Sequence, residues 1–99
     1  MNIVEEKTEN GIILVLDGKI DKISSSVVQS AILTAVAKNS NLTIDFAKVD
    51  YISSAGLRAL LLGQKSSAAK GGKMKLINVG ESVLSILKLS GFDKILSIE

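Results

Sequence analysis

The feature that most constrains the fold is a short apolar segment, residues 42–46, followed soon after by a long run with helical spacing. The apolar segment predicts a strand, and residues 54–70 predict a helix. Between them lies the stretch Asp50-Tyr51-Ile52-Ser53-Ser54-Ala55-Gly56-Leu57-Arg58. Two neighbouring serines, a small residue and a glycine therefore stand where a strand turns into a helix.

This junction has a specific chemistry. The first N–H groups of a helix have no partner within the helix, so serine is favoured at the N-cap. The same N–H groups and the helix dipole favour a negative group at that end. Two interpretations follow. Either Ser53 or Ser54 is only a cap, or the small residues Ala55 and Gly56 leave the Ser54 hydroxyl accessible to another macromolecule.

The rest of the chain alternates between patterns typical of strands and of helices. Asn10-Gly11 predicts a turn that joins the first two strands in an antiparallel hairpin. The second strand is continuously apolar, which is typical of a strand covered on both faces. We expect the helix N-cap among Ser24-Ser25-Ser26, and Gly91 as the residue that ends the last helix, with Phe92 packing back. The predicted strands are residues 2–8, 12–16, 42–46, 73–77 and 95–98, and the predicted helices are residues 25–37, 54–70 and 81–89.

This order predicts an α/β fold. Strands that alternate with helices favour a mainly parallel sheet, and the hairpin makes the sheet mixed. We expect four to five strands with helices packed against them, in one domain over residues 1–99, as a monomer or a weak dimer. No internal repeat, linker or low-complexity segment divides the chain.

Composition excludes several kinds of chemistry. The chain has no His and no Cys, which excludes Ser-His-Asp and Cys-His catalysis, ordinary zinc sites and disulfides. Its net charge is only +2, too weak to predict binding to nucleic acid. The longest apolar run is far shorter than a membrane span, and the acidic, mixed N-terminus is unlike a signal peptide. We expect a cytoplasmic protein without membrane insertion.

No motif predicts a metal, a cofactor or an enzyme. The glycines match neither the dinucleotide-binding nor the phosphate-cradling spacing. The side chains of Asp17, Asp21, Asp45 and Asp50 lack a metal-ligand spacing, and aspartate is common in turns. Asp45 ends a strand, as the phospho-accepting aspartate of a receiver domain does, but five full strand–helix units do not fit into this chain.

Three stretches carry a resemblance to a known family. Residues 45–57, from Asp45 to the Ser53-Ser54-Ala55-Gly56-Leu57 sequence, resemble the signature of the STAS family, named for sulphate transporters and anti-sigma factor antagonists. Gly18-Lys19-Ile20-Asp21 is similar to a loop of that family, and residues 87–95 are similar to its C-terminal helix and tail. The resemblance covers nearly the whole chain and implies a STAS-type fold.

The resemblance also implies a function. In the antagonist branch, the serine that matches Ser54 is phosphorylated. The unphosphorylated form binds an anti-sigma factor that is also a serine kinase, and so releases a sigma factor. Phosphorylation breaks this complex, and a serine phosphatase restores it. The expectation for this chain is a non-enzymatic binding module switched at Ser54.

One departure from the family pattern opens an alternative. The family usually has an aspartate where this chain has Ser53, so Ser53 competes as phosphoacceptor. The alternative is a STAS subunit that is not phosphorylated and belongs to a transport system or a signalling scaffold. In either case the expected partner-binding residues surround the serine motif; they are Asp21, Ser53, Ser54, Ala55, Gly56, Leu57 and Arg58.

Overall fold

Five strands and three α-helices alternate along the chain in the computed structural model, which describes residues 1–99. The predicted order of elements is confirmed, and a short 3-10 helix, η1 (Phe92–Lys94), precedes the last strand. The strands are β1 (Asn2–Thr8), β2 (Gly11–Asp17), β3 (Leu42–Lys48), β4 (Met74–Ile77) and β5 (Ser97–Ile98), and the helices are α1 (Ser24–Lys38), α2 (Ser54–Ala69) and α3 (Glu81–Leu89).

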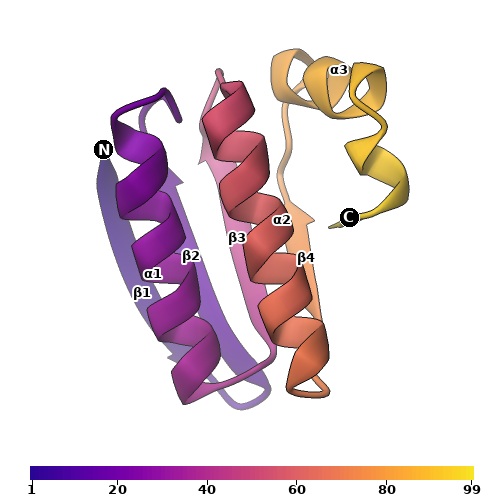
Figure 1. Cartoon of the computed structure of the whole chain (residues 1–99). Helices are drawn as coiled ribbons and strands as arrows, with labels where there is room; N and C mark the ends of the chain where they lie inside the picture. Colours follow the sequence, from indigo (N-terminus) through magenta and orange to yellow (C-terminus); the bar gives the residue numbers. More distant parts are fainter.

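The strands form one mixed sheet in the order β1-β2-β3-β4-β5 (Figure 1). β1 and β2 form the predicted antiparallel hairpin, in which Thr8 pairs with Gly11. All other neighbours are parallel. The carboxyl ends of β2 and β3 therefore lie at the same edge of the sheet, and so do the loops that follow them.

One face of the sheet carries the core. Alternate residues of a strand point to the same face, so Leu14 of β2 and Ile44 of β3, which pair in register, both point toward the helices and are buried. The core cluster contains 20 buried residues, with Phe46 as its largest fully buried side chain. Full burial of one such side chain contributes about 1.5–3 kcal/mol, so this cluster dominates the stability of the fold.

The prediction that β2 is covered on both faces is wrong. Ile13 and Val15 point away from the core and are only half-buried, and α1 and α2 both lie on one side of the sheet (Figure 1). The strand order gives the reason. Each right-handed crossover moves one strand further in the same direction, which places the connecting helices on the same face.

Close contact between α1 and α2 depends on Gly63. A Cβ atom at this position would lie 2.5 Å from Cγ2 of Ile32 in α1 and 3.0 Å from Sδ of Met74 in β4. The fully buried Ser67, one turn later, donates a hydrogen bond from Oγ to the carbonyl oxygen of Ser40 at 2.6 Å. The far end of α2 is thereby fixed to the segment that leads into β3.

The start of α1 differs from the expectation. None of Ser24, Ser25 and Ser26 is the N-cap: α1 begins at Ser24 and the N-cap position is Ile23. The three serine hydroxyls donate backwards to carbonyl oxygens of the preceding loop. The helix is capped by Asp21, whose Oδ1 accepts hydrogen bonds from the N–H groups of Ile23 and Ser24 at 3.0 and 2.8 Å. The carboxylate takes the orphan N–H groups of the first turn, which leaves the serines to fix the loop.

The end of the chain follows the prediction. Gly91 has φ 78°, a left-handed conformation that glycine adopts without strain, and it ends α3. Phe92 is partly buried against the core, as expected. β5, the last of the predicted strands, then pairs with β4 at the edge of the sheet. None of the helices combines the length and the apolar character needed to cross a bilayer.

Candidate functional site

Two loops meet at the edge of the sheet where β2 and β3 end. The N–H of Ile20 donates to the carbonyl oxygen of Tyr51 at 3.0 Å, and the N–H of Ser53 donates to the carbonyl oxygen of Ile20 at 2.8 Å. These bonds form a parallel bridge between Ile20 and Ile52, both of which are buried. The loop around Asp21 and the serine motif, which are distant in sequence, are thus held side by side.

The two serines of the motif have different environments. Ser53 is the N-cap of α2: it is half-buried, and its Oγ accepts a hydrogen bond from the N–H of Gly56 at 3.2 Å. Ser54 is the first residue of the helix, and its side chain is exposed and makes no hydrogen bond within the protein. The cap is therefore Ser53, and the free hydroxyl is that of Ser54.

Gly56 and Leu57 lie beneath the site and not on its surface. Both residues are buried. A Cβ atom at Gly56 would lie 2.6 Å from Cγ2 of Ile20 and 2.7 Å from Cγ1 of Ile52, which is closer than real side chains approach. The absence of a side chain at Gly56 thus lets the first turn of α2 pack on the bridge between the two loops.

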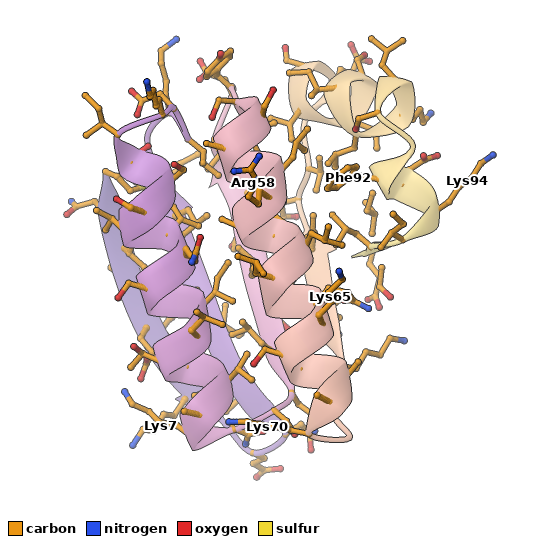
Figure 2. All side chains as sticks on the ribbon, viewed as in Figure 1. Lys7, Arg58, Lys65, Lys70, Phe92 and Lys94 are labelled. Carbon is orange, nitrogen blue, oxygen red and sulfur yellow. The ribbon has the colours of Figure 1, made fainter.

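Ala55 and Arg58 occupy the outer side of the same helix start. Ala55 is half-buried and Arg58 is exposed. Arg58 stands one helical turn after Ser54, and its side chain lies on the outer face of α2 near its N-terminus (Figure 2). The predicted site residues therefore divide into an outer group, which a partner can touch, and the buried pair Gly56 and Leu57.

Asp21 is exposed, but half of its carboxylate is already engaged. Its Oδ1 accepts from the hydroxyl of Ser24 at 3.1 Å in addition to the two N–H groups of the α1 cap. The hydrogen bonds from Ser24, first from its N–H and then from its hydroxyl, hold the pKa of Asp21 below its ordinary value of 3.8. Oδ2 has no partner within the protein, so one oxygen remains available at the surface.

Three further side chains around the serine motif were not predicted as site residues. Nζ of Lys19 stands 5.9 Å from the ring centroid of Tyr51, a cation–π arrangement that links the two loops. Ile23 is 83% exposed at the start of α1, an unusual position for a large apolar side chain.

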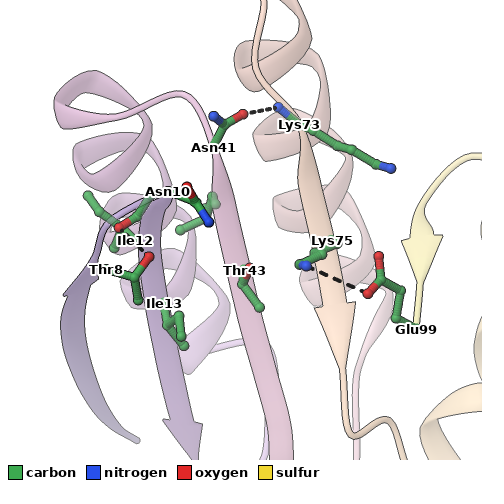
Figure 3. Close-up of a pocket in the computed structure, with 11 residues that line it drawn as sticks. Thr8, Asn10, Ile12, Ile13, Asn41, Thr43, Lys73, Lys75 and Glu99 are labelled. Atoms are coloured by element: carbon green, nitrogen blue, oxygen red, sulfur yellow. Dashed lines mark hydrogen bonds and ion pairs between the residues drawn. The ribbon is translucent and has the colours of Figure 1, made fainter.

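A polar depression lies at the opposite end of the sheet (Figure 3). Its volume is about 370 Å³, and some of its polar groups are paired with one another. The Lys75 ammonium lies 3.6 Å from a carboxylate oxygen of Glu99, and the side-chain oxygen of Asn41 accepts from the N–H of Lys73 at 3.1 Å. These pairs hold β3, β4 and the end of the chain together, so they have a structural role away from the serine motif.

The family follows from the comparison with known sequences. The model of the STAS domain matches residues 2–99, and the chain belongs to the STAS domain family. The anti-sigma-B factor antagonist of Bacillus subtilis (strain 168) is 26% identical over 98 residues, which are 99% of this chain and 90% of that protein. Relatives that match over most of this chain bear the name anti-sigma factor antagonist.

Solved structures show the same fold. An anti-sigma factor antagonist from Mycobacterium paratuberculosis superposes with a TM-score of 0.87 at 22% identity, over 98% of this chain and 83% of that one. SpoIIAA, a cell fate determinant of Bacillus, superposes in its phosphorylated form with a TM-score of 0.74 at 18% identity, over 99% of this chain and 91% of that one. The five-stranded sheet with helices packed on it is therefore the STAS fold.

Proposed function

We propose that this protein is an anti-sigma factor antagonist whose binding is switched by phosphorylation of Ser54. In its unphosphorylated form it binds an anti-sigma factor that is also a serine kinase, and the sigma factor held by that kinase is released. It acts in the cytoplasm as a binding module and not as an enzyme. The names of its relatives and the family of the chain support this proposal.

The observation that carries the proposal is the difference between the two serine hydroxyls. Oγ of Ser53 is occupied by the N–H of Gly56, whereas Oγ of Ser54 is exposed and unbonded. In the proposed transfer the O–H bond of Ser54 breaks and an Oγ–P bond forms. The bond between the β–γ bridging oxygen and the γ-phosphorus of ATP breaks, ADP leaves, and the hydroxyl proton passes to a base of the kinase. A serine phosphatase reverses the state by hydrolysing the Oγ–P bond with water.

The position of Ser54 explains how a phosphate changes binding without unfolding the domain. A phosphate adds about −1.5 to −2 charge, and the N-terminus of α2 is an end of the helix that favours negative charge. The cost therefore arises in the complex, where an unpaired charge meets the partner and commonly weakens binding by about 2–5 kcal/mol.

An alternative rests on Ser53. This residue is uncharged where the family pattern has an aspartate, which favours a STAS subunit that is never phosphorylated and serves a transport system or a signalling scaffold. Such a subunit would bind its partner through the same surface but would show no phosphate on either serine. Isolation of the protein from its own cells and mass spectrometry of the peptide with both serines separate the two functions.

The direct test uses the serine-kinase anti-sigma factors encoded in the same genome. Each kinase is incubated with ATP and the wild-type protein, Ser54→Ala or Ser53→Ala, and the phosphate is located by peptide mass spectrometry. We expect the Ser54→Ala variant alone to escape phosphorylation. Ser53→Ala is the matched control, because it removes a neighbouring hydroxyl and costs about 1 kcal/mol of cap stability. Phosphate on Ser53, or on neither serine, would contradict the proposal.

A further inference from the structure

Arg58 is an exposed guanidinium without a carboxylate partner. The two ion pairs of the protein are Lys38 with Glu5 and Lys75 with Glu99, both far along the chain from the serine motif. Arg58 follows Ser54 by one helical turn on α2, and Figure 2 shows its side chain on the outer face of that helix. Arg58, which has no ion-pair partner, thus stands one helical turn from the residue that the proposed kinase modifies.

We infer that Arg58 binds the phosphate on Ser54 within the same helix and is thereby withdrawn from the partner surface. This inference rests on the function proposed above. Residues four apart on a helix are neighbours, and long helical side chains lean toward the helix N-terminus. Both relationships bring the guanidinium toward Ser54. The planar fork of arginine also matches a phosphate with two hydrogen bonds, which a lysine ammonium does not.

The other cations near the motif belong to another segment or lie further along α2. Lys19 lies over the ring of Tyr51 at 5.9 Å, and Lys22 belongs to the loop before α1, as does Asp21. The next cation on α2 is Lys65, about 16 Å from Ser54 along the helix axis by the rise per residue. Among the cations of α2, Arg58 alone is within one turn of the phosphorylation site.

With this arrangement, phosphorylation changes the charge of the partner surface in two ways. In the unphosphorylated protein the free guanidinium presents one positive charge to the partner, which implies an acidic group opposite it. In the phosphorylated protein the same guanidinium faces the phosphate, and the local charge changes from about +1 to roughly −0.5 to −1. The partner loses an attractive contact and meets a negative charge at the same place.

The first test needs no partner. Phosphoserine is incorporated at position 54 by genetic encoding, and the second pKa of the phosphate is measured by ³¹P NMR. Arg58→Gln should raise this pKa by roughly 0.3–1 unit, because a neighbouring cation favours the dianion, and Arg58→Lys should restore part of the shift. Lys65→Gln is the control, because it removes the same charge about three turns from Ser54. It should leave the pKa of the phosphate unchanged. Equal pKa values in wild type and Arg58→Gln would overturn the inference.

The second test uses the unphosphorylated protein and the anti-sigma factor. Arg58→Gln should lower the affinity at least fivefold, whereas Lys65→Gln should not. A pKa shift without a loss of affinity would refute the withdrawal of Arg58 from the partner surface. Because the NMR titration contains no kinase and no anti-sigma factor, its result is independent of whether the proposed function is correct.

Discussion

The N–H of Ser53 donates to the carbonyl oxygen of Ile20 at 2.8 Å, which fixes the start of α2 to the loop before α1. This bond couples two segments whose side chains together form the candidate partner surface. A substitution that displaces either loop should therefore also displace Ser54 through the backbone, even when the substituted residue is buried beneath the surface.

Substitution of Ser54 should separate binding from switching. Ser54→Ala removes an unbonded hydroxyl, so it should bind the anti-sigma factor with nearly wild-type affinity and resist phosphorylation. Ser54→Asp places a charge in the interface and should lower affinity by roughly thirtyfold or more. Titration calorimetry against the anti-sigma factor with ADP measures both. Equal affinities of the two variants would remove Ser54 from the interface.

Phosphorylation of Ser54 should leave the fold intact. The phosphate would stand in the first turn of α2, where the N–H groups and the helix dipole stabilise negative charge. Thermal unfolding of the two forms, followed by circular dichroism, should give cooperative transitions with similar midpoints. A non-cooperative melt of the phosphorylated protein would mean that the switch works by unfolding.

Gly56→Ala should destabilise the domain. The new Cβ would collide with Ile20 and Ile52, and overpacking of this kind costs about 1–3 kcal/mol. Urea denaturation provides the free energy of unfolding. The matched control is Gly80→Ala, because a Cβ there meets no atom within 4 Å and φ is −74°, so the loss should stay below about 1 kcal/mol.

Gly56→Ala also tests how the buried layer supports the surface. Displacement of Ile20 or Ile52 would shift the bridge that holds the two loops, so partner affinity should fall together with stability. If stability falls while affinity and phosphorylation persist, Gly56 is a packing residue without influence on the site.

Asp21 should make the stability depend on pH in the acidic range. Its pKa in the folded protein is lowered from 3.8 by hydrogen bonds from Ser24. Because the pKa is lower in the folded than in the unfolded protein, the ionised carboxylate stabilises the fold at pH values above the pKa of the unfolded state. This contribution disappears as the pH falls through the pKa of the folded state. The Asp21→Asn variant keeps an acceptor oxygen but has no charge. It should be less stable than wild type at pH 6 and equal to it at the acidic end of the titration, as measured by urea denaturation at each pH. A difference that does not change with pH would contradict this role of the charge.

Local sequence pattern was enough to predict which segments form strands and helices. The periodicity of apolar residues depends only on local geometry, so the order of the elements, the hairpin at Gly11 and the end of α3 at Gly91 were predicted correctly. The serine motif was also found from the sequence, because its position between a strand and a helix is a local property.

The burial and the hydrogen-bond partners of these segments depend on contacts between residues that are distant in the chain. The open second face of the sheet, with Ile13 and Val15 half-buried, follows from the direction of the crossovers, which a single strand does not encode. At the start of α1, the carboxylate of Asp21 accepts from the N–H groups of Ile23 and Ser24, while the hydroxyl of Ser24 turns back into the loop. The two neighbouring serines differ because only the exact start of α2, fixed by the contact of Gly56 with Ile20 and Ile52, makes Ser53 the cap and leaves Ser54 exposed.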